Sequence, residues 1–176
     1  MTSSSINNFC DYINSIIDDT RPMIVNNFII INNYISTIDN NKIMENDEFK
    51  IGCLISKILP SLSIEDYIKH VLQCGIIETD NINGIILYTI NMLKHLKNKG
   101  LKLNSYNCHR IIITLFMLSS KIHEEFYYSN ASWAEACGTN TQDINAMEVV
   151  ILKLLDYNLN ISISPHNAIN IYKCIY

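Results

Sequence analysis

The stretch RIIITLFMLSSK, residues 110–121, constrains the fold more than any other part of the chain. Between its two terminal charges every side chain is apolar or small and uncharged, so a helix built from it has no charged face. A helix that is hydrophobic all round must be surrounded by other elements. We therefore expect residues 106–122 to form the central helix of a helical bundle. The apolar runs within it are far shorter than the roughly 20 residues of a membrane span.

Helix start and stop signals divide the rest of the second half into further segments. Ser63 with Asp66, and Asn140 with Asp143, have the spacing of capping boxes. Glycine closes three apolar segments, at the position where a helix favours a left-handed residue: Gly75, Gly100 and Gly138. The predicted helices span 64–74, 82–98, 106–122, 130–137 and 141–156. Because no hairpin signal occurs, the predicted fold class is all-α, a five-helix bundle around the buried central helix.

The N-terminal third is expected to be a helical extension. Residues 6–18 and 23–38 have helical periodicity interrupted at Arg21-Pro22, and the polar stretch 40–50 is typical of a loop. This pattern predicts that the N-terminal third forms one or two helices packed beside the bundle. The expected organisation is an extension at 1–48, the bundle at 49–163 and a short C-terminal helix at 164–176, after Pro165.

The amino-acid composition limits the classes of partner and the cellular compartments that we expect for this chain. The chain is 48% hydrophobic and 17% charged, with a net charge of -4 and no basic stripe, so we expect no nucleic-acid partner. Its six cysteines (10, 53, 74, 108, 137 and 174) form no CxxC pair, which disfavours a metal site and favours reduced thiols. The start, MTSSSINNFC, has no apolar signal region. We expect no membrane association and a cytoplasmic and/or nuclear location.

The sequence contains no residue pattern that strongly indicates a catalytic site. His123-Glu124-Glu125 lacks the four-residue histidine spacing of a helical metal site, and the pattern favours a solvated helix end. No two glycines lie close enough to form a phosphate loop. A cysteine nucleophile is not excluded, but nothing favours one cysteine over another. The sequence therefore predicts no enzyme, no cofactor and no small-molecule substrate.

Residues 121–148 favour a contact surface. Lys121 ends the central helix, and Glu148 lies among apolar neighbours, where a lone carboxylate is costly without a partner. The two could form an internal salt bridge or hold a partner protein. The pattern allows Tyr127 and Tyr128 a place in the core and favours one for Trp133.

Three longer motifs resemble those of the P/U-type cyclins: SIEDYIKHV, NSYNCHRIIITLFMLSSKIHEEFYYSNASWAEACG and TQDINAMEVVILKLLDYNL. The family has a His-Arg pair before its third helix, here His109-Arg110. It also has a Tyr/Phe-x-Asn-Ala-x-x-Ala-x-x-Gly passage, here spread over residues 128–138, and a Leu-Asn-x-Leu-Glu motif that residues 144–148 resemble. The resemblance covers about residues 49–163 and is specific only as a combined pattern.

The resemblance implies a regulatory subunit that binds a cyclin-dependent protein kinase and presses on its αC helix. Its kinase-binding residues carry over to the following positions: Lys121, Ile122, Glu124, Glu148, Tyr157 and Leu159. The alternative is a cyclin-fold adaptor or scaffold in transcription or signalling that activates no kinase. A helical enzyme has little support.

This sequence also departs from better-known cyclins. The Arg–Asp pair inside the box of mitotic cyclins is not visible, because no Arg follows Ser63 and Asn91 stands at the Asp position. The substrate-docking patch near their first helix is also not apparent.

Overall fold

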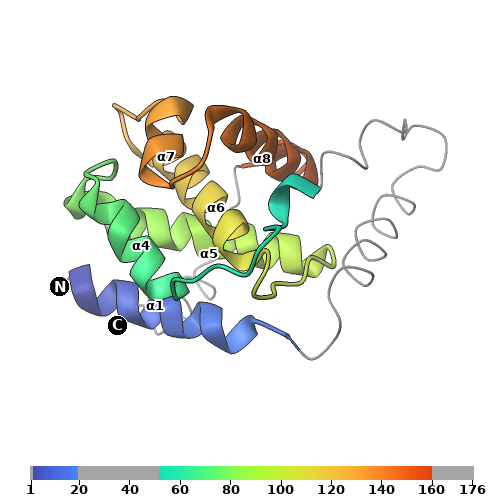
Figure 1. Ribbon diagram of the computed structural model, residues 1–176. Coiled ribbons are helices and arrows are strands. Elements are labelled where there is room, and N and C mark those ends of the chain that lie inside the picture. Colours follow the sequence, from blue (N-terminus) through green and yellow to red (C-terminus); the bar gives the residue numbers. More distant parts are fainter. Residues whose placement is uncertain (1, 20–51, 160–176) are drawn as a thin grey trace.

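The computed structural model describes residues 2–19 and 52–159. Six α-helices lie within these ranges (Figure 1): α1 Thr2–Ile16, α4 Ile64–Gln73, α5 Ile82–Asn98, α6 Cys108–His123, α7 Asn130–Ala136 and α8 Thr141–Leu154. Two short 3-10 turns, Gly52–Leu54 and Thr79–Asn81, precede α4 and α5. Within the described ranges the only strand-like pairing is an isolated bridge between Ile17 and Leu103. The all-α prediction is confirmed.

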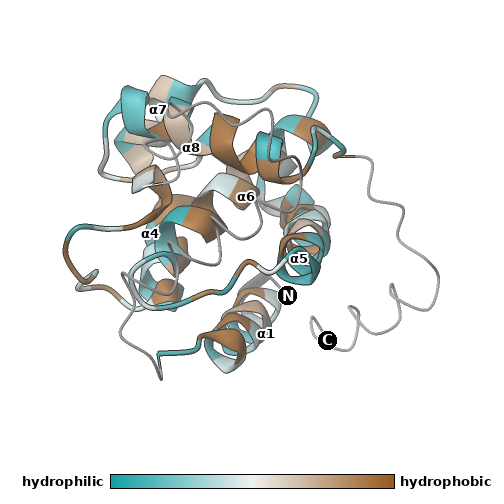
Figure 2. Cartoon of the chain, turned by 90° about the vertical axis from the view of Figure 1, so that its right-hand side faces the viewer, coloured by the Kyte–Doolittle hydropathy of each residue, from teal (hydrophilic) through white to brown (hydrophobic). Residues whose placement is uncertain are grey.

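The apolar stretch forms the central helix, as predicted. Every residue of α6 from Ile111 to Ser120 is buried. Helices α4, α5 and α8 all contact α6, which lies in the middle of the fold in Figure 2. Its few polar side chains are satisfied locally, because the Thr114 hydroxyl donates to the Arg110 carbonyl at 2.7 Å and Ser119 Oγ lies 2.9 Å from Thr89 Oγ1.

The boundaries of the five bundle helices fall within two residues of expectation, and the predicted caps set the starts of α4 and α8. Helix α1, expected at 6–18, begins four residues earlier. Ser63 Oγ accepts the Asp66 N–H at 3.0 Å, and Asn140 Oδ1 accepts the Asp143 N–H at 2.8 Å. Gly138 ends α7 with a φ of +64°, a conformation that glycine adopts without a steric cost. Helix α6 begins two residues later than expected. The reason is Asn104, whose Oδ1 accepts the N–H groups of Tyr106 and Asn107 and closes a turn in place of the helix.

Helix α1 belongs to the same core as the bundle. It contacts α4 and α5, and its Phe9, Cys10 and Ile13 are fully buried. The chain after it is also held, because the Asp18 N–H donates to the Leu103 carbonyl at 3.0 Å. Helix α1, the described part of the N-terminal extension, therefore packs against the bundle. The predicted helix at 23–38, the loop at 40–50 and the helix after Pro165 lie outside the described residues, and the proposed domain boundaries stay predictions.

Candidate functional site

A polar network joins three helices at one corner of the bundle. Lys121 Nζ, near the end of α6, donates to Glu148 Oε1 of α8 and to Asn130 Oδ1 at the start of α7, both at 2.5 Å. Asn130 Nδ2 donates in turn to Glu148 Oε2 at 2.6 Å and to Asn145 Oδ1 at 2.7 Å. The internal salt bridge that the sequence left open is therefore present, and Asn130 connects both of its members.

Local structure fixes each member of this network. Ser129 caps α7, because its Oγ accepts the Ser132 N–H at 3.3 Å, and this sets Asn130 as the first residue of the helix. Glu148 lies two turns into α8 behind the Asn140 cap. Lys121 comes directly after the buried part of α6, where its side chain leaves the core. The sequence contained the Ser129 cap, but the resemblance motif drew attention only to Asn130.

The charges of the pair remain accessible from outside. The side chains of Lys121 and Glu148 are 22% and 17% exposed, so solvent reaches both of them. A partly solvated pair of this kind adds little to stability by itself, on the order of 1 kcal/mol. An ordered, accessible pair can still fix the orientation of a partner, because charged groups at an interface contribute to specificity more than to affinity.

Exposed apolar side chains lie next to the network in sequence. Ile122 follows Lys121, Val149 follows Glu148, and Phe126 in the loop between α6 and α7 is 83% exposed. Tyr127 and Tyr128 in the same loop are exposed as well, so the core position that the pattern allowed them is wrong. Trp133 is fully buried, as the sequence favoured. Large apolar side chains grouped at a surface are typical of a protein-contact site.

The remaining apolar residues of the predicted site follow α8. Tyr157 is exposed, whereas Leu159 is half-buried and packs against the core. Both lie beyond the C-terminal end of α8, and Glu148 lies in its middle. The structure thus places Lys121, Ile122 and Glu148 where α6, α7 and α8 meet. Tyr157 lies just beyond the C-terminal end of α8.

Glu124 differs from one of its two expectations. The residue is only 8% exposed, so the solvated helix end predicted for it is wrong. One carboxylate oxygen accepts the Glu78 N–H at 3.0 Å, and the other accepts the Ser120 hydroxyl. Glu124 therefore ties the end of α6 to the turn before α5. Because Glu124 is buried, it offers a partner protein less surface than Lys121 or Glu148 does, and its kinase-binding role stays a prediction. His123 and Glu125, its two neighbours, are exposed as predicted.

An Arg–Asp pair is present, but between other residues than in mitotic cyclins. Arg110 Nη2 donates to Asp143 Oδ2 at 3.0 Å, and its Nε donates to the Cys53 carbonyl, so α6 is linked to α8 and to the segment before α4. Asn91, at the position where an Asp was expected, is buried with no partner for its Nδ2. The motif at residues 109–110 contained Arg110, but nothing in the sequence indicated its partner.

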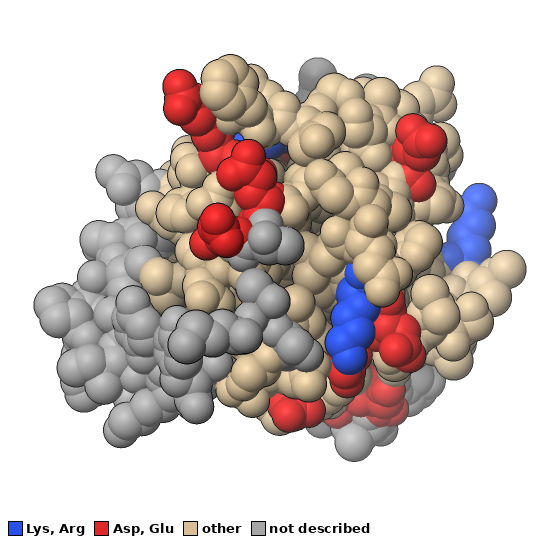
Figure 3. Space-filling model, turned by 90° about the vertical axis from the view of Figure 1, so that its left-hand side faces the viewer, with Lys and Arg blue, Asp and Glu red and all other residues tan. Residues whose placement is uncertain are grey.

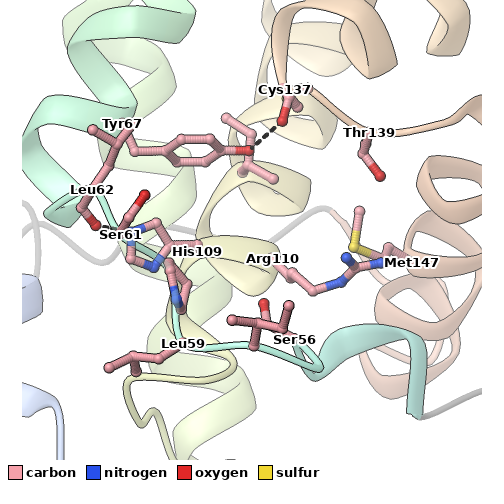
Figure 4. Close-up of a pocket in the computed structure, with 14 residues that line it drawn as sticks. Ser56, Leu59, Ser61, Leu62, Tyr67, His109, Arg110, Cys137, Thr139 and Met147 are labelled. Carbon is pink, nitrogen blue, oxygen red and sulfur yellow. Dashed lines mark hydrogen bonds between the residues drawn. The ribbon is translucent and has the colours of Figure 1, made fainter.

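A pocket of about 410 Å³ lies between this Arg–Asp pair and the segment that leads into α4 (Figure 4). Tyr67 donates its hydroxyl to the Cys137 carbonyl at 3.2 Å across one side, and His109 Nε2 lies 2.9 Å from the Leu62 carbonyl. Ile58, Leu59 and Leu62 line its rim and are exposed. The sequence did not indicate this pocket, because its lining combines α4, α6 and α8 with the 56–62 and 137–139 segments, which only the tertiary fold brings together.

Most of the described thiols are poorly suited to nucleophilic chemistry. Burial raises the pKa of Cys10 to about 12 and the pKa of Cys53, Cys108 and Cys137 to about 11. At neutral pH these four are protonated, and the thiolate is the reactive form. Among the described residues no three His, Cys, Asp or Glu side chains are grouped as metal ligands.

Two further findings concern the membrane and the nucleic acid, which the sequence did not favour as partners. None of the described helices has the length and hydropathy needed to cross a bilayer. The face shown in Figure 3 is largely uncharged, and the Lys and Arg side chains visible on it lie apart from one another. On that face no basic stripe of the kind that tracks a phosphate backbone is present.

Comparison with known proteins identifies the class that this fold and surface define. The model of the cyclin family matches residues 23–159. The chain belongs to the cyclin family. It is 29% identical over 121 residues to the PHO85 cyclin-like protein psl1 of Schizosaccharomyces pombe, which covers 68% of this chain and 49% of that protein.

Plant cyclins of the U type are similar as well. Cyclin-U4-1 of Arabidopsis thaliana is 28% identical over 62% of this chain and 53% of its own length. Cyclin-U1-1 of the same plant is 31% identical over 58% of this chain and 48% of its own length. These findings confirm the resemblance to P/U-type cyclins. The chain spans about half the length of the curated relatives it matches.

Proposed function

We propose that this cyclin is the regulatory subunit of a cyclin-dependent serine/threonine protein kinase, which it binds and activates. The observation that carries the proposal is the Lys121–Asn130–Glu148 network, with exposed apolar residues next to its members in sequence. We call this set the docking surface, defined by Lys121, Ile122, Asn130, Glu148, Val149 and the loop 126–128. Tyr157 and Leu159 extend it along α8.

The polar network gives the docking surface its orientation. An ammonium group has three protons, and Lys121 uses two of them, one on Glu148 and one on Asn130. The third is left for a backbone carbonyl of the kinase. Each oxygen of Glu148 accepts one internal bond and keeps a lone pair for a kinase N–H. Because Asn130 already holds both charges in place, little side-chain freedom is lost on binding.

The apolar side chains supply the affinity. Aromatic residues in an interface carry a large share of its binding free energy when water is excluded around them. Phe126, Tyr127 and Ile122 are already at the surface, so their burial against a partner is a net gain of apolar contact. The polar network of the docking surface joins the end of α6, the start of α7 and the middle of α8, three helices that pack on one core, which suits it to press on a mobile helix such as αC of a kinase.

In this account the chain contributes no catalytic group. Phosphoryl transfer takes place in the kinase, where the docked αC helix completes a Lys–Glu ion pair and the activation segment becomes ordered. The family and the similarity to a PHO85 cyclin-like protein support a kinase of the cyclin-dependent class as partner. We place the complex in the cytoplasm and/or nucleus, where thiols remain reduced, with no nucleic acid, membrane or small-molecule substrate involved.

Co-purification with the cyclin-dependent kinases of the same organism tests the proposal. The expected result is a stable complex with one kinase and a rise in its phosphoryl transfer. Lys97→Ala, which changes an exposed lysine of α5 that is not among the residues defining the docking surface, is the matched control for Lys121→Ala. If the folded chain binds none of these kinases, the proposal is wrong and the cyclin-fold adaptor without a kinase becomes the better account.

A further inference from the structure

The turn that ends α8 has an unusual backbone. Asp156 and Tyr157 have φ values of +54° and +55°, the only non-glycine residues with positive φ in the described ranges. Their hydrogen bonds are those of a Schellman motif, since the Tyr157 N–H donates to the Leu152 carbonyl at 2.8 Å and the Asp156 N–H to the Lys153 carbonyl at 2.9 Å. Glycine usually fills the first left-handed position of this motif. Here two residues with side chains fill consecutive left-handed positions, which carries a steric cost.

The side chain of Tyr157 gives the fold little in return for this cost. It is 63% exposed, whereas Leu155 before it is fully buried and Leu159 after it packs against the core. The turn is therefore anchored on both sides and lifts one aromatic ring into solvent between the anchors. A strained residue that persists with its side chain exposed points to a role outside the fold.

Lys99 holds the turn in this conformation. It is the C-cap of α5, and its Nζ donates to the Leu154 carbonyl at 2.9 Å and to the Asp156 carboxylate. The first bond satisfies one of the carbonyls left open at the end of α8, where a cation also complements the helix dipole. The second fixes the side chain of the first left-handed residue. The side chain of Lys99 is only 20% exposed, because most of it is covered by the protein.

We propose that Lys99 is a positioning residue that keeps the left-handed Asp156–Tyr157 turn in place so that Tyr157 is presented, already ordered, to the kinase. The inference rests on the proposed function and adds to it: the affinity of the docking surface depends on a residue that does not touch the partner. An exposed ring held in one position loses less conformational entropy on binding than a mobile one. The strain lowers the stability of the free chain and is kept because the ring needs that position.

The strain is tested without any partner, by comparing Tyr157→Gly with Tyr157→Ala. Both variants remove the ring, but only glycine relieves the left-handed strain. The glycine variant is expected to melt about 2–4 °C above the alanine variant. At an ordinary position the order is the reverse, since glycine has the greater unfolded-state entropy. A glycine variant that melts at or below the alanine variant would overturn the strain part of the proposal.

Kinase affinity tests the presentation of the ring. Tyr157→Ala and Tyr157→Gly should both weaken binding about tenfold or more, as expected for an aromatic anchor. Lys99→Met keeps the aliphatic stem and should weaken binding about three- to tenfold, a loss on the order of 1 kcal/mol. Lys99→Arg should recover most of that loss, because it restores a donor to both acceptors. Lys97→Met, in the last turn of the same helix, is the control and should bind as the wild type does.

The outcomes separate this inference from the proposed function. If the wild-type chain binds a kinase and Tyr157→Ala weakens binding while Lys99→Met does not, the docking surface stands and the positioning role of Lys99 is wrong. If both Tyr157 variants bind as the wild type does, the presentation of Tyr157 is wrong. If no kinase binds the wild type, the proposed function fails, and the melting comparison still decides whether the turn is strained.

Discussion

Phe9 of α1 packs against Phe116 of the central helix α6, with ring centroids 5.3 Å apart and ring planes at 57°. Both rings are essentially fully buried. This tilted contact joins the first described helix of the chain to the middle of the bundle, across more than a hundred residues of sequence. The N-terminal helix is therefore part of the hydrophobic core and not an accessory to it.

Truncating either ring should strongly destabilise the protein. Phe9→Ala and Phe116→Ala should each lower the free energy of unfolding by about 3–5 kcal/mol, the usual cost of a large buried cavity. Denaturant titration measures this, with the exposed Phe126→Ala as control, for which a change of about 0.5 kcal/mol or less is expected. A loss below about 1 kcal/mol for Phe9→Ala would mean that α1 does not belong to the core.

The cap of α8 should have a measurable effect on stability. Asn140→Ala removes the acceptor of the Asp143 N–H and should cost about 1 kcal/mol, whereas Asn140→Asp keeps an acceptor and should be nearly neutral. Thermal melts of the two variants, beside the exposed Gln142→Ala in the first turn of the same helix, provide the comparison. Equal losses for the alanine and aspartate variants would show that the side-chain cap is unimportant.

Glu124 should be required for the junction of α6 and α5. Glu124→Ala leaves the Glu78 N–H without its acceptor, and we expect a loss of about 1–3 kcal/mol in stability. Glu124→Gln retains a carbonyl oxygen for that N–H and should lose less. Hydrogen exchange at the Glu78 amide gives a local measurement: it should accelerate in the alanine variant and stay slow in the glutamine variant. Unchanged exchange in both would contradict the role assigned to this carboxylate.

The half-buried His109 should make stability depend on pH on the acid side. Burial lowers the pKa of His109 from its ordinary value of 6.5, and bonds to the backbone at Leu62 and Ser63 offset only part of this. Because the unfolded chain then binds the proton more readily, stability is complete above pH 6.5 and falls as the pH decreases toward the lowered folded value. His109→Gln should flatten this part of a plot of melting temperature against pH. An unchanged slope in that variant would assign the dependence to other groups.

Patterns along the sequence were enough to predict the helices, because each relied on local chemistry. The glycines at 75, 100 and 138 end their segments for a steric reason, and all three have positive φ. The apolar character of residues 111–118, interrupted only by Thr114, indicated that α6 lies in the centre. The capping serine and asparagine at 63 and 140 gave helix starts to within a residue.

Features that depend on tertiary contacts were not predictable in the same way. Nothing local distinguishes Glu124, which is buried by a turn 46 residues earlier, from the exposed Glu125 beside it. The left-handed turn at Asp156–Tyr157 has no glycine to indicate it, and Lys99, which holds it, lies 57 residues away. Tyr127 and Tyr128 are aromatic and could have been core residues, but the loop between α6 and α7 leaves both side chains exposed. The pairing of Lys121 with Glu148 was one of two alternatives, and Asn130 was not foreseen as the link between them.

An exchange of charges in the Lys121–Glu148 pair tests the central claim most directly. The double variant Lys121→Glu/Glu148→Lys keeps an internal ion pair, and the Asn130 amide can rotate to serve both members in the reversed arrangement. Each single reversal places two like charges together and should lower the melting temperature, and the double variant should restore it.

The decisive measurement is phosphoryl transfer by the kinase after it is mixed with the double variant. We predict that the variant melts like the wild type yet fails to bind and activate the kinase, because the charges offered to the partner are inverted. If the double variant restores kinase activation together with the melting temperature, the pair is only structural and the docking surface lies elsewhere.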